Sequence, residues 1–169
     1  MNKLDPSVAG SEQLLMTQLD ANHSCNGYRA LTAPGLVIGL TTASSVKITN
    51  TTTYLFAGAF KSKTTAEVPF ITTTHDIAAN ASTVQERMYV LYLDGSGNPT
   101  IVAGAISTGA GTALLPERTY TLTPIGSVRI AVAAGATNFT ANTTLLSAAA
   151  LTVTYTDIGF LAPRFDSAQ

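Results

Sequence analysis

The sequence predicts an all-β protein: a single β-sandwich of jelly-roll-like topology, preceded by an N-terminal arm that contains a short helix. After residue 36, short runs rich in β-branched and aromatic residues alternate with turn residues, which is typical of strands in a small sandwich. The length of 169 residues matches one compact core. We therefore expect an arm over residues 1–35 and a β-sandwich domain over residues 36–169.

The arm carries a helical pattern. Ser11 is a candidate N-cap, and the apolar residues Leu14, Leu15 and Leu19 follow at roughly helical spacing. We expect a helix confined to residues 11–20. Its three turns or so are too few to be stable alone in water, so the helix must dock on its own body or on a neighbouring molecule.

About eight strand-like runs follow the arm. The last of them alternates Leu151, Val153 and Tyr155 with threonines, as a strand does when one of its faces is wet. Tyr89, Leu91 and Leu93 share one face of an earlier run and indicate core. The runs cover residues 36–40, 46–49, 53–61, 67–71, 87–94, 100–106, 127–132 and 151–156.

Three turn and breaker signals organise these runs. Residues 94–99, with the sequence Asp-Gly-Ser-Gly-Asn-Pro, predict a hairpin connection. Pro69 favours an edge strand or a bulge, because proline donates no hydrogen bond to a neighbouring strand. The glycine-rich segment 104–111 is expected to be a loop, and it lacks the Lys-Ser/Thr ending of a phosphate-binding loop.

Residues that carry chemistry are few and scattered. His23 and His75 are the two histidines, and both are expected in surface loops; Cys25 is the lone cysteine, so no intrachain disulfide or thiolate cluster can form. Asp76 follows His75 directly, and neighbours on an extended segment point to opposite faces, so this pair does not suit a catalytic triad. No Gly-x-Ser-x-Gly motif presents a nucleophile. We expect no enzyme, no cofactor and no metal site.

Two acid–base dipeptides stand directly before strand-like runs. They are Glu86-Arg87 and Glu117-Arg118. We regard these four residues, together with the three leucines of the arm, as candidates for a subunit interface or a docking contact. An exposed ion pair contributes only about 0–1 kcal/mol, so the dipeptides would specify a contact more than they would stabilise it.

The low content of charged residues indicates which binding partners are expected. Charged residues make up 11% of the chain, against about 25% in a usual soluble domain, and no charged residue lies between Arg129 and Asp157. Such a surface predicts burial between copies, in a homotrimer or a similar closed oligomer. The net charge of −1 offers no basic footprint for nucleic acid or an anionic membrane. Gly135 and Asn138 interrupt the uncharged stretch, which excludes a membrane span.

The segment from residue 88 to residue 155 contains a Tyr-x-Leu-Tyr-Leu-Asp hairpin at residues 89–94, a Pro-Ile-Gly-x-Val strand at residues 124–128 and Asn-Phe-Thr at residues 138–140. With this pattern it resembles virion proteins of tailed bacteriophages. The likeness covers about residues 50–160. It implies a small jelly-roll-like domain, commonly trimeric, of the head decoration (cement) protein family, which binds the major capsid protein.

The N-terminal sequence shows no apolar region of a secretion signal, yet the threonine-rich, charge-poor body is typical of extracellular surfaces. A particle that is assembled in the host cytoplasm and then released reconciles these observations, so we expect the protein on the virion surface. The alternative is a subunit of a tail fibre or receptor-binding protein that binds a host glycan or protein. Copy number in a purified particle separates the two.

Overall fold

The fold is all-β, as the sequence predicts. The computed structural model describes residues 27–40, 44–71, 73–119 and 121–157. Within these ranges all the sheet pairing is antiparallel. The predicted helix over residues 11–20 lies outside them. The strands are β1 (Arg29–Ala30), β2 (Leu36–Ile38), β3 (Ser45–Ile48), β4 (Thr52–Phe56), β5 (Ala59–Lys63), β6 (Ala66–Pro69), β7 (Gln85–Leu93), β8 (Pro99–Thr108), β9 (Thr123–Val132) and β10 (Leu151–Asp157).

The four long C-terminal strands form the largest sheet, in the order β10-β9-β7-β8. β7 lies in the middle of this sheet and pairs with β8 on one side and β9 on the other. Tyr89, Leu91 and Leu93 point to one face of β7 and are fully buried, which confirms the predicted core stripe. Valines and isoleucines of β9 complete this face because they alternate in the same way.

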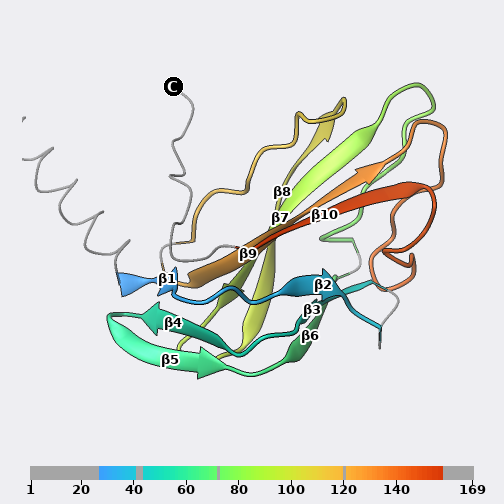
Figure 1. The fold of residues 1–169 in the computed structure, drawn as a ribbon. Helices are drawn as coiled ribbons and strands as arrows, with labels where there is room; N and C mark the ends of the chain where they lie inside the picture. The colour runs from blue at the N-terminus through green and yellow to red at the C-terminus, as the bar shows by residue number, and fades with distance from the viewer. Residues whose placement is uncertain (1–26, 41–43, 72, 120, 158–169) are drawn as a thin grey trace, which may run out of the picture.

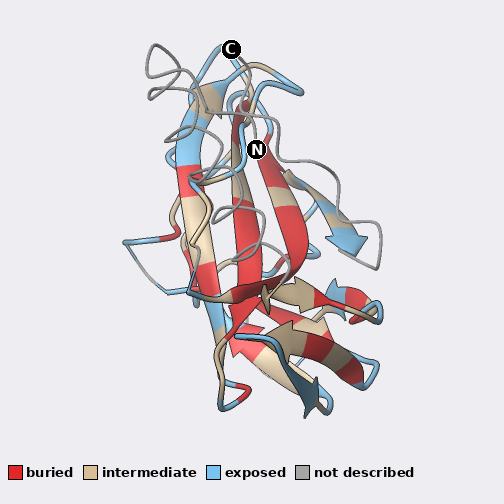
Figure 2. Cartoon of the chain, turned by 90° about the vertical axis from the view of Figure 1, so that its left-hand side faces the viewer, coloured by how far each residue is buried: buried red, intermediate tan, exposed pale blue. Residues whose placement is uncertain are grey.

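Two three-stranded sheets, β1-β4-β5 and β2-β3-β6, cover the inner face of the large sheet (Figure 1). Their buried side chains, among them Tyr54, Val46 and Val68, join the large sheet in one hydrophobic cluster. Figure 2 shows buried stretches along the long strands and exposed stretches mainly in the loops. The two layers are also tied by polar contacts, since the Tyr54 hydroxyl donates to the Asp94 carbonyl over 2.9 Å.

The run over residues 53–61 was predicted as one strand, and this prediction was wrong. The chain reverses at Ala57 and Gly58, whose φ angles are 49° and 79°. Two consecutive positive φ angles are the geometry of a tight hairpin turn, so the run divides into β4 and β5. Pro69, in contrast, lies on β6, which is an edge strand as predicted.

The β7–β8 connection confirms the predicted hairpin. Asp94 organises it, because its carboxylate accepts the N–H groups of Ser96 and Asn98, each over 2.8 Å. These bonds, the Asn98 backbone contact first, lower the pKa of Asp94. The loop predicted over residues 104–111 is shorter than expected, since β8 continues to Thr108.

The β8–β9 connection, of which residues 109–119 and 121–122 are described, returns across the outer face of the large sheet. Gly104 of β8 permits this close approach: a Cβ there would lie 2.6 Å from the carbonyl oxygen of Leu114. The connection also reaches β7 further along, where the N–H of Thr119 meets the Tyr92 hydroxyl at 3.5 Å. It therefore covers β7 and β8, while the threonines on the outer face of β10 stay exposed.

The segment that the sequence assigned to the arm contributes to the body at its C-terminal end. Arg29 and Ala30 pair with Leu55 and Tyr54 of β4, and Ala30 is buried. The Asp157 carboxylate at the end of β10 accepts the N–H of Leu36 over 2.9 Å. Among the described residues, no helix is long and apolar enough to cross a membrane.

Candidate functional site

Glu86 is fully buried and is used inside the subunit. Its carboxylate pairs with Arg129 of β9, whose Nε lies 2.8 Å away, and it accepts the N–H of Ala113 over 2.6 Å. Burial of the carboxyl raises its pKa, but the bonds from Ala113, Arg129 and Gly111 outweigh this, and the pKa lies below its ordinary value. Glu86 therefore fastens the β8–β9 connection to the sheet.

Arg87 points to the opposite face of β7 and also binds main chain. Its Nε donates to the Gly104 carbonyl over 2.6 Å, and its Nη1 donates to the carbonyls of Thr74 and Asp76 over 2.8 and 3.2 Å. The guanidinium carbon lies 5.7 Å from the ring centroid of Tyr89. Arg87 thus holds the segment that follows β6 against the sheet.

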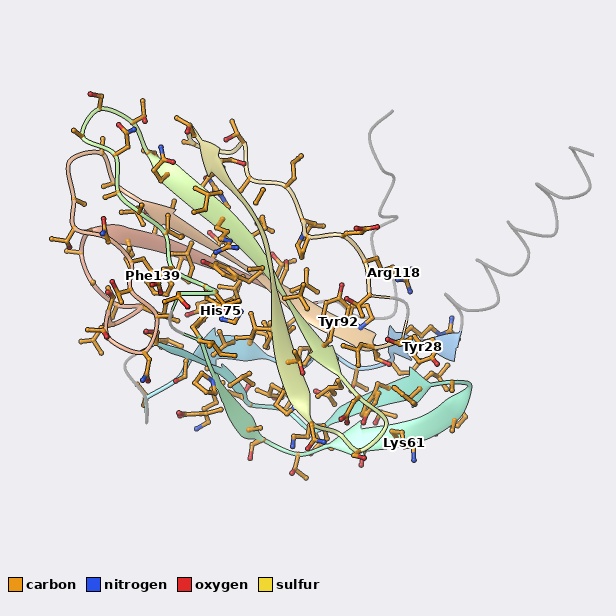
Figure 3. The ribbon with its side chains drawn as sticks, turned by 180° about the vertical axis from the view of Figure 1, so that it is seen from behind. Tyr28, Lys61, His75, Tyr92, Arg118 and Phe139 are labelled. Atoms are coloured by element: carbon orange, nitrogen blue, oxygen red, sulfur yellow. The ribbon has the colours of Figure 1, made fainter. Side chains whose placement is uncertain are left out.

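The second dipeptide lies in the β8–β9 connection. Glu117 is exposed and Arg118 is half-buried, and Figure 3 shows Arg118 at the end of the body away from His75. The structure therefore places the two dipeptides in different elements. The predicted docking residues Leu14, Leu15 and Leu19 lie outside the described residues.

His75 was expected on the surface, and this expectation was wrong: the side chain is only 1% exposed. Its ring packs edge-on against Phe70 and Tyr89, with centroids 5.6 and 5.7 Å away. Its Nδ1 accepts the N–H of Ile71 over 2.8 Å, and its carbonyl accepts the Tyr89 hydroxyl over 2.6 Å. Burial, and then the charge of Arg87, lower the pKa of His75, so the ring is held neutral.

The residues next to His75 link two distant loops. The Asp76 carboxylate accepts the N–H of Ala141 over 2.8 Å, and Ile77 exchanges two main-chain hydrogen bonds with Phe139 of 2.9 and 3.0 Å. The Phe139 ring packs edge-on against Phe70, with centroids 5.8 Å apart. We call the group formed by Phe70, His75, Asp76, Tyr89 and Phe139 the His75 node; His75 and Phe139 are labelled in Figure 3.

Three exposed aliphatic side chains lie on segments close in the chain to Ser44 or to its hydrogen-bond partners Phe70 and Thr144. Leu40, Ile71 and Leu145 are 83%, 61% and 58% exposed. Ser44 connects two of their segments: its carbonyl accepts the N–H of Phe70, next to Ile71, over 2.9 Å, and its hydroxyl donates to the carbonyl of Thr144, next to Leu145, over 2.8 Å. We call these three side chains the apolar rim. Ser44 itself is buried and hydrogen-bonded, and exposed large aliphatic side chains such as those of the apolar rim are suited to contact with another protein.

No local signal in the chain predicted the apolar rim or the His75 node. Their members come from segments near residues 40, 70, 89, 139 and 145, which only the tertiary fold brings together. Over the described ranges, no group of three or more His, Cys, Asp or Glu side chains is placed to hold a metal ion. The site can offer apolar contact and exposed hydroxyls to a partner.

Comparison with protein-family models gives no match, and searches of curated proteins and of solved structures find no similar protein.

Proposed function

We propose that this chain is a virion structural protein: a capsid decoration (cement) protein that binds and stabilises a phage head through protein–protein contacts. Its partners are the major capsid protein and copies of itself in a closed oligomer, for which the sequence favours a homotrimer. We infer that the body is a β-sandwich of jelly-roll-like topology; the packing of two small sheets on one large sheet supports the two-layer arrangement. The proposed role involves no enzymatic activity, no cofactor and no binding to nucleic acid or membranes.

One observation carries the structural role: ionisable side chains across the described body bind main-chain groups. Carboxylates accept backbone N–H groups, Arg87 donates to three carbonyls, and His75 accepts the N–H of Ile71. Such bonds hold loops in place, because each satisfies a main-chain N–H or C=O group that has no partner in a neighbouring strand. The acids that do this are Glu67, Asp76, Glu86, Asp94 and Asp157.

A rigid, charge-poor body suits a protein that is repeated at many symmetric positions. Each contact with the shell can then be weak, because a linked contact forms at high effective concentration. The apolar rim supports protein contact, since large aliphatic side chains gain most when another apolar surface removes them from water. The virion surface, reached after assembly in the host cytoplasm, is the proposed location.

Deletion of residues 1–20 tests the anchoring part of the proposal. Burial of Leu14, Leu15 and Leu19 on the capsid would contribute about 1.5–3 kcal/mol each, so the truncated chain should lose far more than about tenfold in affinity for heads. Sedimentation of heads with bound protein measures this, and circular dichroism should show an intact β body. Full occupancy by the truncated protein would contradict the arm as anchor.

Substitution of the apolar rim tests the second contact. The double variant Ile71→Asp/Leu145→Asp should bind heads at least about tenfold more weakly, because two charges would be desolvated at the interface. Its thermal stability should change little, since both side chains are exposed. Leu114→Asp is the matched control, because Leu114 is 74% exposed on a different element and should leave binding unchanged.

Copy number in purified particles decides the location. Gel densitometry against the major capsid protein should show many copies per head. A few copies, found only at the tail tip, would replace the decoration role with the tail-fibre alternative.

A further inference from the structure

The edges of the three sheets differ in how they are protected from pairing with other chains. An exposed edge strand is a template for another strand unless it is short, charged, bulged, or interrupted by proline. β5 carries Lys61 and Lys63, and β6 carries Pro69. β8 is bulged opposite residues 87–89, while β1 and β2 have only two and three residues.

β10 is the described edge strand that has none of these devices. It has seven residues, contains no proline, and carries no charge from Leu151 to Thr156. Its pairing with β9 is regular over its whole length. Within the described part of the chain it pairs only with β9, and its other side faces away from the sheet.

The hydrogen-bonding pattern identifies which groups this free side presents. The N–H of Ala133 donates to the carbonyl of Ala150 over 3.0 Å, so residues 133 and 150 form a hydrogen-bonded pair. Bonded and non-bonded pairs alternate along an antiparallel ladder, so residues 152, 154 and 156 bond to β9. The main-chain groups of Leu151, Val153 and Tyr155 therefore point outward.

Two neighbouring contacts limit the usable length of this edge. The N–H of Leu151 already donates to the carbonyl of Ala148 over 2.9 Å, and Asp157 binds the backbone of Gly35 and Leu36 over 3.1 and 2.9 Å. The available groups are the carbonyl of Leu151 and both main-chain groups of Val153 and Tyr155.

We propose that β10 pairs in an antiparallel direction with β10 of a second copy, about a twofold axis at Val153; this closed dimer is an alternative to the homotrimer that the sequence favours. This joins the four-stranded sheets of two copies into one continuous sheet. Val153 then exchanges two hydrogen bonds with Val153 of the second copy, and each Tyr155 N–H donates to Leu151 of the other copy. A shift by two residues along the partner strand pairs fewer of the outward groups or requires Asp157, so the centred register is favoured.

The side chains suit this register. Leu151 would lie opposite Tyr155, Val153 opposite itself, and Thr152 opposite Thr154, all of which are favourable cross-strand pairs. The absence of charge matters because a twofold axis near a charged residue brings like charges together. The same surface serves both copies, as a twofold interface requires.

The test compares two variants that differ at one residue. In Thr152→Glu/Thr154→Glu, the register places glutamate opposite glutamate twice; in Thr152→Lys/Thr154→Glu, it places lysine opposite glutamate twice. Within the subunit Thr154 lies opposite Arg129 on β9, so glutamate at residue 154 is compatible with the fold in both variants. Circular dichroism and thermal melting verify that both variants are folded.

Light scattering on the purified chain at micromolar concentration should give about twice 17.5 kDa for the natural protein. The Glu/Glu variant should dimerise about thirtyfold more weakly, and the Lys/Glu variant should remain dimeric. A monomeric or trimeric natural protein overturns the proposal, as do two variants with the same mass. Because this experiment contains no capsid, its result neither supports nor contradicts the proposed decoration role, which the head-binding experiments test separately.

Discussion

Replacement of Glu86 by alanine is expected to lower the free energy of unfolding by about 3 kcal/mol. The change leaves the Arg129 guanidinium and the Ala113 N–H without their carboxylate, and the loss of one member of a buried pair typically costs about 3–5 kcal/mol. We expect the lower end of this range, because the Arg129 side chain keeps 31% of its exposure and water can solvate it in part. Urea denaturation measures the loss.

Glu117→Ala is the matched control for Glu86→Ala, because Glu117 is exposed in the β8–β9 connection and should cost less than about 0.5 kcal/mol. Acid should act in the same direction as Glu86→Ala. The pKa of Glu86 is depressed in the folded chain, so its contribution is complete above the ordinary carboxyl pKa and is lost as pH falls through the folded value. Equal stability of the two alanine variants would refute this account of Glu86.

Acidification below about pH 6.5 is expected to destabilise the body through His75. Burial and Arg87 lower its pKa, although a backbone hydrogen bond with Ile101 and the nearby Asp76 act in the other direction. The unfolded chain therefore binds a proton at a higher pH than the folded chain does. Neutral His75 makes its full contribution to the free energy of unfolding above the pKa that it has in the unfolded chain. This contribution falls by up to about 1.4 kcal/mol per pH unit as the pH drops toward the pKa of His75 in the folded chain.

Urea denaturation between pH 7 and pH 5 measures this dependence. His75→Gln should be less stable than the natural protein at pH 7, because the ring contacts with Phe70 and Tyr89 are lost, and its stability should depend less on pH. His23→Gln is the control, since His23 is the other histidine of the chain, and it should keep the natural slope. Identical slopes in the natural protein and His75→Gln would exclude His75 as the titrating group.

Local signals in the sequence located much of the fold. The hairpin at residues 94–99 was predictable because its turn residues lie between two alternating runs, and the β10 pattern was predictable because one face is wet along its whole length. The turn at Ala57 gave no such signal, since alanine rarely takes a positive φ. The segment 104–111 was predicted as a loop because it is rich in glycine, but Gly104 lies within β8, where the structure uses it for close contact with the β8–β9 connection.

The buried polar contacts were less predictable, because they depend on what covers each face. Glu86 stands next to Arg87, and period-2 alternation alone does not tell which face of β7 is covered. The cover for Glu86 comes from Ala113, 27 residues later. His75 looked like a loop histidine because its neighbours Phe70 and Tyr89 are brought to it by different segments.

The clasp of Glu86 on Arg129 and Ala113 also has a consequence for the order of assembly. Glu86 and Arg129 are 43 positions apart and belong to neighbouring strands, so their carboxylate–guanidinium site exists only after β7 and β9 have paired. We therefore expect the β8–β9 connection to dock on that completed surface, late in folding. Contacts that form after the transition state slow unfolding and leave the folding rate nearly unchanged, so we expect Glu86→Ala to speed unfolding much more than it slows folding.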